Sequence, residues 1–237
     1  LIKISLFRKI GMSILEIESC LSSDGDILYS VLRRIQHQLD IDERKKEVLE
    51  LIIKGEKQEI INKKIALIES EESIYERLER IFPGYFGQML FAAYQPFLNE
   101  SLGKDEEEAF EKYVDYLDNL PLFQLSKDEQ NYIEKISSTF DMQILKKVNK
   151  DKINAIENVE KWLKENDNTI SQYEEYKNSE EYQKSLMKQI QDKLQNFMKD
   201  NKYYEIAIPL IRKFSKSYDD YYKKLIVAND KYLEIKC

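Results

Sequence analysis

The chain has few of the residues that usually interrupt helices or build specialised sites. It has six glycines, four prolines, two cysteines and one histidine among 237 residues. Every glycine lies at or before Gly103, and only Pro121 and Pro209 are strong breakers after that point. Runs of β-branched residues joined by hairpin turn signals are also missing, so the sequence predicts an all-α protein with long helices.

The scarcity of cysteine and histidine narrows the chemistry that the chain can perform. Catalytic triads and Cys–His pairs need side chains that are hardly present, and there is no glycine-rich phosphate loop. Cys20 and Cys237 do not make a disulfide framework, which is typical of a reducing cytoplasm, and His37 lacks partners at zinc-ligand spacing. We therefore expect no enzyme activity, no cofactor and no metal, in a cytoplasmic protein.

The charge and hydropathy patterns exclude two further classes of partner. No apolar run approaches the length that spans a membrane, so we expect no membrane contact. The formal net charge is −7, and an acidic chain does not neutralise phosphates, so we expect no specific DNA binding by these residues alone. The composition, 42% hydrophobic and 34% charged, is that of a folded protein rather than a disordered one.

Two short helices are predicted at the start of the chain. An apolar-periodic segment over residues 1–10 is followed by Gly11 as a break, and Ser13 opens a second helix over residues 14–21. Ser13 and Glu16 have the spacing of a capping box, in which each side chain accepts a hydrogen bond from an unpaired backbone N–H group at the helix start.

A long helix is predicted next, from about residue 27 to residue 54, with Asp24 or Asp26 as its cap. At about 1.5 Å per residue it would be roughly 42 Å long, and its apolar stripe needs a partner. That partner is either the same helix of a second subunit or the core of a monomer. The expected dimerisation residues are Leu28, Leu32, Ile35, Leu39, Val48, Leu49 and Ile52.

This order of helices resembles the second half of the DNA-binding domain of the MerR family of bacterial transcription regulators, followed by that family's dimerisation helix. The likeness covers about the first 54 residues. The segment at 82–100, FPGYFGQMLFAAYQPFLNE, resembles part of the effector domains of MerR-type activators of multidrug efflux transporters. The residues that carry the first likeness are Ile2, Leu6, Ile10, Gly11, Met12, Ser13, Leu15, Glu16 and Ile17.

The resemblance implies a homodimer in which the long helices pair antiparallel. It also implies that a helix-turn-helix and a basic wing precede Leu1, so we expect this chain to be a fragment that reaches DNA only through that preceding part. The expected domains are a remnant of the DNA-binding domain at 1–24, a coiled-coil dimerisation helix at 25–54 and an all-helical effector-binding domain at 55–237.

The effector domain is expected to consist of amphipathic helices that contain many aromatic residues. There are 16 tyrosines, 10 phenylalanines and one tryptophan in the chain. Aromatic faces attract organic cations, and a nearby carboxylate adds charge complementarity. The alternative is that these aromatics only fill the core. Helices are predicted at 56–82, 105–120, 126–140, 143–165, 170–199 and 203–235. The expected ligand-binding residues are Phe91, Tyr94, Phe97, Tyr113, Tyr116, Tyr218, Asp219 and Tyr222.

Together these features lead to one functional hypothesis and one rival. The hypothesis is a ligand-responsive transcriptional regulator that senses small lipophilic, drug-like cations and activates an efflux gene. The rival is a helical interaction or scaffold protein, which would use its long helix as a coiled-coil partner and would have no small-molecule site.

Overall fold

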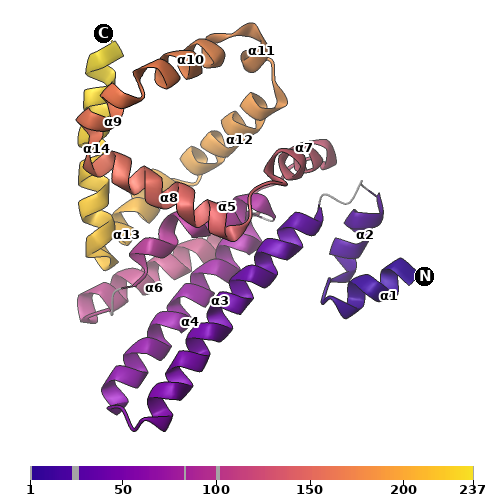
Figure 1. Ribbon diagram of the computed structural model, residues 1–237, viewed down its shortest axis with the longest axis vertical. Helices are drawn as coiled ribbons and strands as arrows, with labels where there is room; N and C mark the ends of the chain where they lie inside the picture. Colours follow the sequence, from indigo (N-terminus) through magenta and orange to yellow (C-terminus); the bar gives the residue numbers. More distant parts are fainter. Residues whose placement is uncertain (1, 23–26, 83, 100–101, 237) are drawn as a thin grey trace. The chain divides into compact units, whose positions relative to one another are not determined.

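The structure is a computed structural model that describes residues 2–22, 27–82, 84–99 and 102–236 (Figure 1). The described residues form helices and no strands, which confirms the predicted all-α class. The chain divides into two compact units. The first unit combines Leu1–Ala92 with Gln124–Leu145, and the second combines Ala93–Phe123 with Lys146–Cys237.

The first unit begins with two short helices and one long helix, as the sequence predicts. Gly11 has a φ of 91°, a left-handed conformation that suits glycine at the end of the first helix. The Ser13 N–H donates to the Glu16 carboxylate at 2.6 Å and the Glu16 N–H donates to the Ser13 hydroxyl at 3.2 Å, which confirms the capping box. The expected caps Asp24 and Asp26 lie outside the described residues. The three helices are α1 (Ile2–Lys9), α2 (Ile14–Ser22) and α3 (Ile27–Ile53).

The long helix α3 is half of a helical hairpin. Gly55, with a φ of 72°, turns the chain so that α4 (Gln58–Ile81) runs back along α3 (Figure 1). Arg44 donates to both oxygens of the Glu71 carboxylate at 2.8 Å, a bidentate pair between the two helices. The apolar contacts of the hairpin come from Ile41, Val48, Ile61 and Ile68.

Two later helices complete the first unit. The helix α5 (Tyr85–Tyr94) follows α4 closely, and its last two residues belong to the second unit. The helix α7 (Lys127–Ser137) is distant in sequence but packs on α3, and the Ser126–Glu129 capping box that opens it is present as predicted. The buried apolar residues near the junction of α4 and α5 are Leu78, Ile81, Phe82, Phe86 and Phe91.

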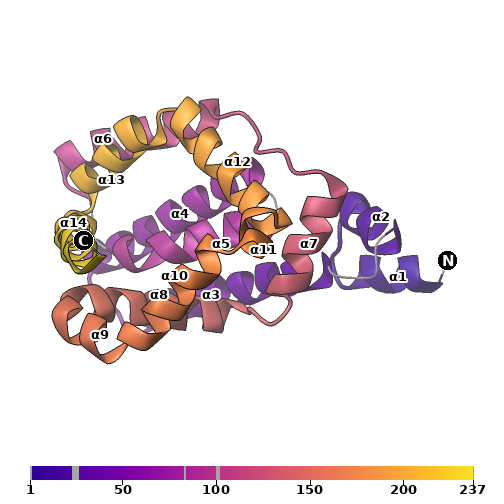
Figure 2. The same ribbon diagram turned by 90° about the horizontal axis from the view of Figure 1, so that it is seen from above.

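The second unit is built around the packing of α6 (Lys104–Asn119) on α13 (Ile208–Phe214), which lie side by side in Figure 2. Its buried core includes Tyr113, Leu117 and Ile211. The helix α8 (Met142–Glu157) begins in the first unit and enters the second at Lys146. The remaining elements are the 3-10 helix η1 (Gln95–Phe97), α9 (Val159–Glu165), α10 (Asp167–Asn178), α11 (Glu180–Gln183), α12 (Leu186–Asp200), the π-helix η2 (Tyr203–Ala207) and α14 (Lys216–Lys236).

Helices that the sequence predicts as continuous at 170–199 and 203–235 are divided in the structure. Ser179 and Ser185 accept hydrogen bonds from the backbone N–H groups that follow them by three residues, at 3.2 Å in each case, and so begin new helices. Ser215 does the same for α14. A serine hydroxyl offers the backbone an alternative to the helical hydrogen bond, which hydrophobic periodicity does not reveal.

We predict that Gly87→Ala destabilises the protein strongly. A Cβ atom at position 87 would lie 2.5 Å from the Phe82 carbonyl oxygen and 2.8 Å from the Glu79 Cα atom, so the backbones of α4 and α5 would have to separate. The free energy of unfolding should fall by about 2 kcal/mol in urea denaturation followed by circular dichroism. Gly103→Ala is the control, because its Cβ would meet only the flexible Glu106 side chain. Equal losses for both variants would contradict the prediction.

Candidate functional site

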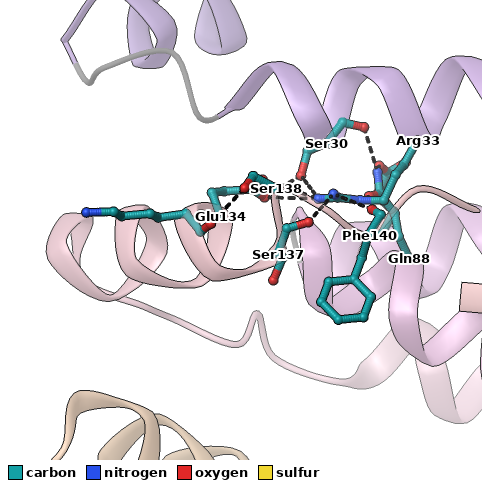
Figure 3. A network of polar contacts seen from close by, with 9 residues as sticks. Ser30, Arg33, Gln88, Glu134, Ser137, Ser138 and Phe140 are labelled. Atoms are coloured by element: carbon teal, nitrogen blue, oxygen red, sulfur yellow. Dashed lines mark hydrogen bonds and ion pairs between the residues drawn. The ribbon is translucent and has the colours of Figure 1, made fainter. Parts of the chain in front are cut away.

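A buried polar network joins α3, α5 and α7 in the first unit, and Arg33 lies at its centre (Figure 3). The Arg33 side chain is fully buried, with 0% of its surface exposed. Ser30, Arg33 and His37 follow one another along the inner face of α3, and all three are buried. Burying a polar group destabilises a fold unless the group is hydrogen-bonded. This face can therefore pack only against helices that supply hydrogen-bond partners.

Each of the five N–H groups of the Arg33 guanidinium has an acceptor. Two of the acceptors are backbone carbonyls, one of Ser137 at the end of α7 and one of Phe140, three residues after it. The acceptors are Gln88 Oε1 at 2.6 Å, Ser30 Oγ at 2.9 Å, the Phe140 carbonyl at 3.0 Å, the Glu134 carboxylate at 3.2 Å and the Ser137 carbonyl at 3.3 Å.

The network extends from Arg33 through Gln88 into α4. The Gln88 amide donates to the Ser30 carbonyl at 3.0 Å and to the Glu79 carboxylate at 3.1 Å. Burial raises the pKa of Glu79, and the hydrogen bond from Gln88 partly opposes that rise. The Tyr85 ring lies 5.2 Å from the guanidinium carbon, within range of a cation–π contact. Four helices of the first unit therefore share one hydrogen-bonded cluster.

Sequence reasoning did not find this network. The ion pair joins Arg33 to Glu134, residues that are 101 positions apart, and the hydroxyl of Ser30 also donates to Glu134. No spacing rule connects residues so distant. The only local signal is that Ser30 and Arg33 occupy the side of α3 opposite its apolar stripe.

The outer face of α3 carries an apolar stripe that the described residues leave mostly exposed, although Ile35 is partly buried against the cluster that contains Met12 and Ile17. Leu39 is 62% exposed and Ile53 is 82% exposed. The positions follow steps of four and three residues without interruption, which is the spacing of a coiled-coil seam. We call this set the outer face of α3: Leu28, Leu32, Ile35, Leu39, Asp42, Lys46, Leu49 and Ile53.

Two of the predicted dimerisation residues do not follow this spacing. Val48 is buried in the hairpin contact with α4, so its side chain is used within one chain. Ile52 is half exposed but lies beside the seam, because the step of four residues from Leu49 leads to Ile53. The sequence pattern included Val48 and Ile52 because it shows apolar residues but not which of two faces each one joins.

The first two helices also expose apolar side chains. In α2, Ile17 and Cys20 are buried against Met12 and Val31, and Arg34 of α3 pairs with Glu16 at 3.1 Å. In contrast, α1 has no buried residue. The exposed side chains of this segment include Ile2, Leu6, Ile10, Ile14 and Leu15.

The structure places the predicted ligand-binding residues in two different units. Phe91 is buried in the first unit, where its ring lies 4.9 Å from that of His37 and 5.0 Å from that of Tyr75. The other seven residues belong to the second unit. Phe91 therefore packs with a histidine and a tyrosine of its own unit.

Several of the seven form an aromatic cluster around Tyr218 within the second unit. Its ring lies 5.3 Å from Phe97, 5.8 Å from Tyr94 and 6.3 Å from Tyr222. The hydroxyl of Tyr116 donates to the Asn201 carbonyl at 3.0 Å. The prediction that these residues bind a ligand stays a prediction, because their mutual contacts alone would also suit a core.

Asp219, the expected charge partner of a cationic ligand, already has two cationic neighbours. Lys223 Nζ and Arg212 Nε each lie 2.6 Å from its carboxylate, and these hydrogen bonds hold the pKa of Asp219 below its usual range. The Arg212 guanidinium also lies 4.7 Å from the centre of the Tyr222 ring. The places beside Asp219 and Tyr222 where a cationic ligand could bind are thus occupied by cationic side chains of the protein.

Sequence reasoning missed three members of this aromatic cluster. Tyr221 lies 4.9 Å from Phe97, and Phe214 lies 5.5 Å from Tyr113. Both follow the same helical steps as Tyr218, so the pattern contained a signal for them. Tyr203 is the third, and its hydroxyl is hydrogen-bonded to that of Tyr94. It lies on a π-helix, whose register differs from the α-helical spacing used to read the sequence.

Comparisons with protein families, with curated proteins and with solved structures find no match to this chain. Within the described ranges, no helix is both long and apolar enough to cross a membrane. The same residues contain no group of three or more histidine, cysteine, aspartate and glutamate side chains arranged to hold a metal ion. Function must therefore be inferred from the outer face of α3 and from the aromatic cluster.

We predict that Arg33→Met costs far more stability than Arg34→Met. Removing the Arg33 guanidinium leaves Glu134 buried without its cation, which should lower the free energy of unfolding by about 3 kcal/mol. Arg34 is partly exposed in its pair with Glu16, so its loss should cost less than about 1 kcal/mol. Urea denaturation of the two variants measures the difference.

A double variant provides the control for this prediction. Replacing Arg33 by Met together with Glu134 by Leu removes both buried charges, so it should be more stable than Arg33→Met alone. If the Arg33 and Arg34 variants lose the same stability, the network does not hold the helices as described.

Proposed function

We propose that the chain is the dimerisation and effector-binding part of a ligand-responsive transcription regulator of the MerR type, and that it acts as a homodimer. The observation that carries this proposal is the outer face of α3, which is regular in spacing, mostly exposed, and apolar except at Asp42 and Lys46. Such a face on a 27-residue helix is stabilised by a matching helix. A second copy of this chain supplies one.

The two charged positions of the outer face favour antiparallel pairing. In a parallel pair, each Asp42 would face the Asp42 of the second copy, and each Lys46 would face its Lys46, so like charges would meet in the seam. In an antiparallel pair centred between these positions, Asp42 faces Lys46 twice, and Leu39 faces Leu49. This arrangement is the one that the resemblance to MerR regulators implies.

The first two helices support a link to DNA binding in the proposed regulator. Their order, the Gly11 break and the capping box of Ser13 and Glu16 are those on which the resemblance rests. The exposed apolar residues of α1 would suit a packing partner such as the helix-turn-helix of a MerR regulator. DNA would then be contacted through that part, because the chain as a whole has a net charge of −7.

The second unit is the proposed effector domain. An effector changes a regulator only when it binds one arrangement of the dimer better than another. Its coupling to the promoter would follow from a change in orientation of the two DNA-binding parts. The expectation that the effector is a lipophilic cation stays a prediction, although Asp219 is already paired with Arg212 and Lys223.

A scaffold or interaction protein is the second candidate, and one observation favours it. The aromatic side chains of the second unit contact one another closely, as they would in a core without a ligand site. Both candidates need the pairing of α3. They differ in whether the second unit binds a small molecule, which titration with small aromatic probes decides.

We predict that the wild-type chain is a dimer and that Leu39→Asp dissociates it. The substitution would place a carboxylate of each copy in the apolar seam, where burial of an unpaired charge is costly. Because Leu39 is 62% exposed within one chain, the fold itself should keep its stability. Light scattering at micromolar concentration measures the mass, and circular dichroism measures the helix content.

Leu122→Asp is the matched control, because Leu122 is a similarly exposed leucine outside α3. It should leave the dimer intact. A wild-type chain that is monomeric at micromolar concentration would refute the proposed homodimer and favour the interaction protein, whose outer face of α3 would pair with a different chain.

A further inference from the structure

An open hollow lies along one face of the junction between α8 and α9, within the second unit. Its volume is about 430 Å³, which falls in the range of sites that hold small molecules. The residues that line it combine one large aromatic ring with amide and charged side chains. We call it the Trp162 hollow, and its lining includes Asp151, Asn154, Asn158, Lys161, Trp162 and Glu165.

The lining residues share one face because the helical hydrogen bonds continue through the junction. The Asn158 N–H donates to the Asn154 carbonyl at 3.2 Å, and the Trp162 N–H donates to the Asn158 carbonyl at 2.9 Å. The lining positions follow one another in steps of three and four residues, which is the spacing of one side of a helix. Asn158 itself has φ −124° and ψ 45°, so the regular helix is interrupted where the hollow lies.

The aromatic ring in the hollow is the only tryptophan of the chain. The Trp162 side chain contributes to the surface rather than to the core, because 41% of the residue is exposed. Tryptophan offers the largest apolar ring face among the side chains, and it is also the side chain that attracts cations most strongly. Trp162 therefore presents a face on which an organic group can pack without displacing any part of the protein.

The charges of the hollow favour a cation over an anion. Lys161 Nζ lies 3.9 Å from the Glu165 carboxylate, so these two opposite charges largely offset each other. Asp151 differs from both, because among the described residues its carboxylate has neither an ion pair nor a hydrogen bond. One negative charge is thus left without compensation. A ligand with one positive charge would neutralise the hollow, whereas an anion would be repelled by it.

The aromatic cluster around Tyr218, where the sequence predicts the cation site, offers neither feature. Its rings pack on one another, and the Asp219 carboxylate is already held by Arg212 and Lys223. A cation would have to displace side chains of the protein there. The Trp162 hollow has open space, an exposed ring and a carboxylate that needs no such displacement.

We propose that the Trp162 hollow binds an organic cation, whose substituted ammonium group packs on the indole ring and is balanced by the Asp151 carboxylate. Carbon substituents on the nitrogen give the ligand apolar surface for the ring, which a hydrated metal cation lacks. The amides of Asn154 and Asn158 can exchange hydrogen bonds with polar groups of the ligand. The proposal rests on the proposed function in one respect, since in a ligand-responsive regulator this cation is the effector.

The test compares three probes of similar shape and different charge. Choline is the cation, dimethylbutanol is its neutral isostere with carbon in place of nitrogen, and dimethylbutanoate is the anion. Trp162 is the only tryptophan, so its fluorescence, excited where tyrosine does not absorb, reports on the hollow in the full chain. Choline should bind saturably with a dissociation constant of about a few millimolar, at least about fivefold tighter than dimethylbutanol. Dimethylbutanoate should give no saturable change.

Two variants that keep the tryptophan should shift this affinity in opposite directions. Asp151→Asn removes the uncompensated charge, so choline should lose most of its advantage over dimethylbutanol. Lys161→Gln removes the competing cation and frees Glu165, so choline should bind about twofold more tightly. A gain in affinity cannot come from a damaged fold. Asp167→Asn is the matched control, because Asp167 is an exposed aspartate outside this lining, and that variant should bind choline as the wild type does.

Four outcomes would overturn the proposal. These are no saturable response to choline, equal binding of choline and dimethylbutanol, strongest binding of dimethylbutanoate, and unchanged choline binding in both Asp151→Asn and Lys161→Gln. Equal binding would mean that the hollow is only an apolar cleft. None of these results bears on the mass measured by light scattering, so failure of the Trp162 hollow and failure of the proposed dimer are told apart.

Discussion

The helix α3 has one polar face that is buried and one apolar face that is exposed. The packing of the first unit depends on the hydrogen bonds of the buried polar face. Its inner face carries Ser30, Arg33 and His37, all buried within the first unit. Its outer face carries a regular apolar stripe that is left exposed. A buried guanidinium without its hydrogen-bond partners strongly destabilises the fold. The Arg33 network therefore determines which helices of the same chain pack on the inner face of α3. The outer face is then the surface on which we propose that a second copy packs.

The inner network explains why α7 packs on α3 although the two are far apart in sequence. Glu134 and Ser137 of α7, with Phe140 just after the helix, together accept most of the hydrogen bonds that Arg33 donates. Gln88 connects the same cluster to α5 and, through Glu79, to α4.

Much of the helical framework could be predicted because its signals are local. Gly11, the two capping boxes and the hydrophobic periodicity of α3 depend on residues only a few positions apart. The Arg33–Glu134 pair depends on tertiary contact and has no local signal. Val48 was wrongly grouped with the outer face for another reason. The sequence shows that Val48 is apolar, but only the packing of α4 on α3 shows that it faces α4. In the aromatic cluster, Tyr218 followed from α-helical spacing, whereas Tyr203 did not because of the π-turn that carries it.

Disulfide cross-linking is the most direct test of the central claim, that the outer face of α3 pairs antiparallel with a second copy. The background carries Cys20→Ser and Cys237→Ser, and Leu39→Cys and Leu49→Cys are introduced in separate chains that are then mixed and oxidised mildly. Antiparallel pairing centred between Asp42 and Lys46 predicts a covalent dimer of Leu39→Cys with Leu49→Cys, and little product from either variant alone. A covalent dimer formed by Leu39→Cys with itself, or no covalent dimer in any mixture, would contradict the claim.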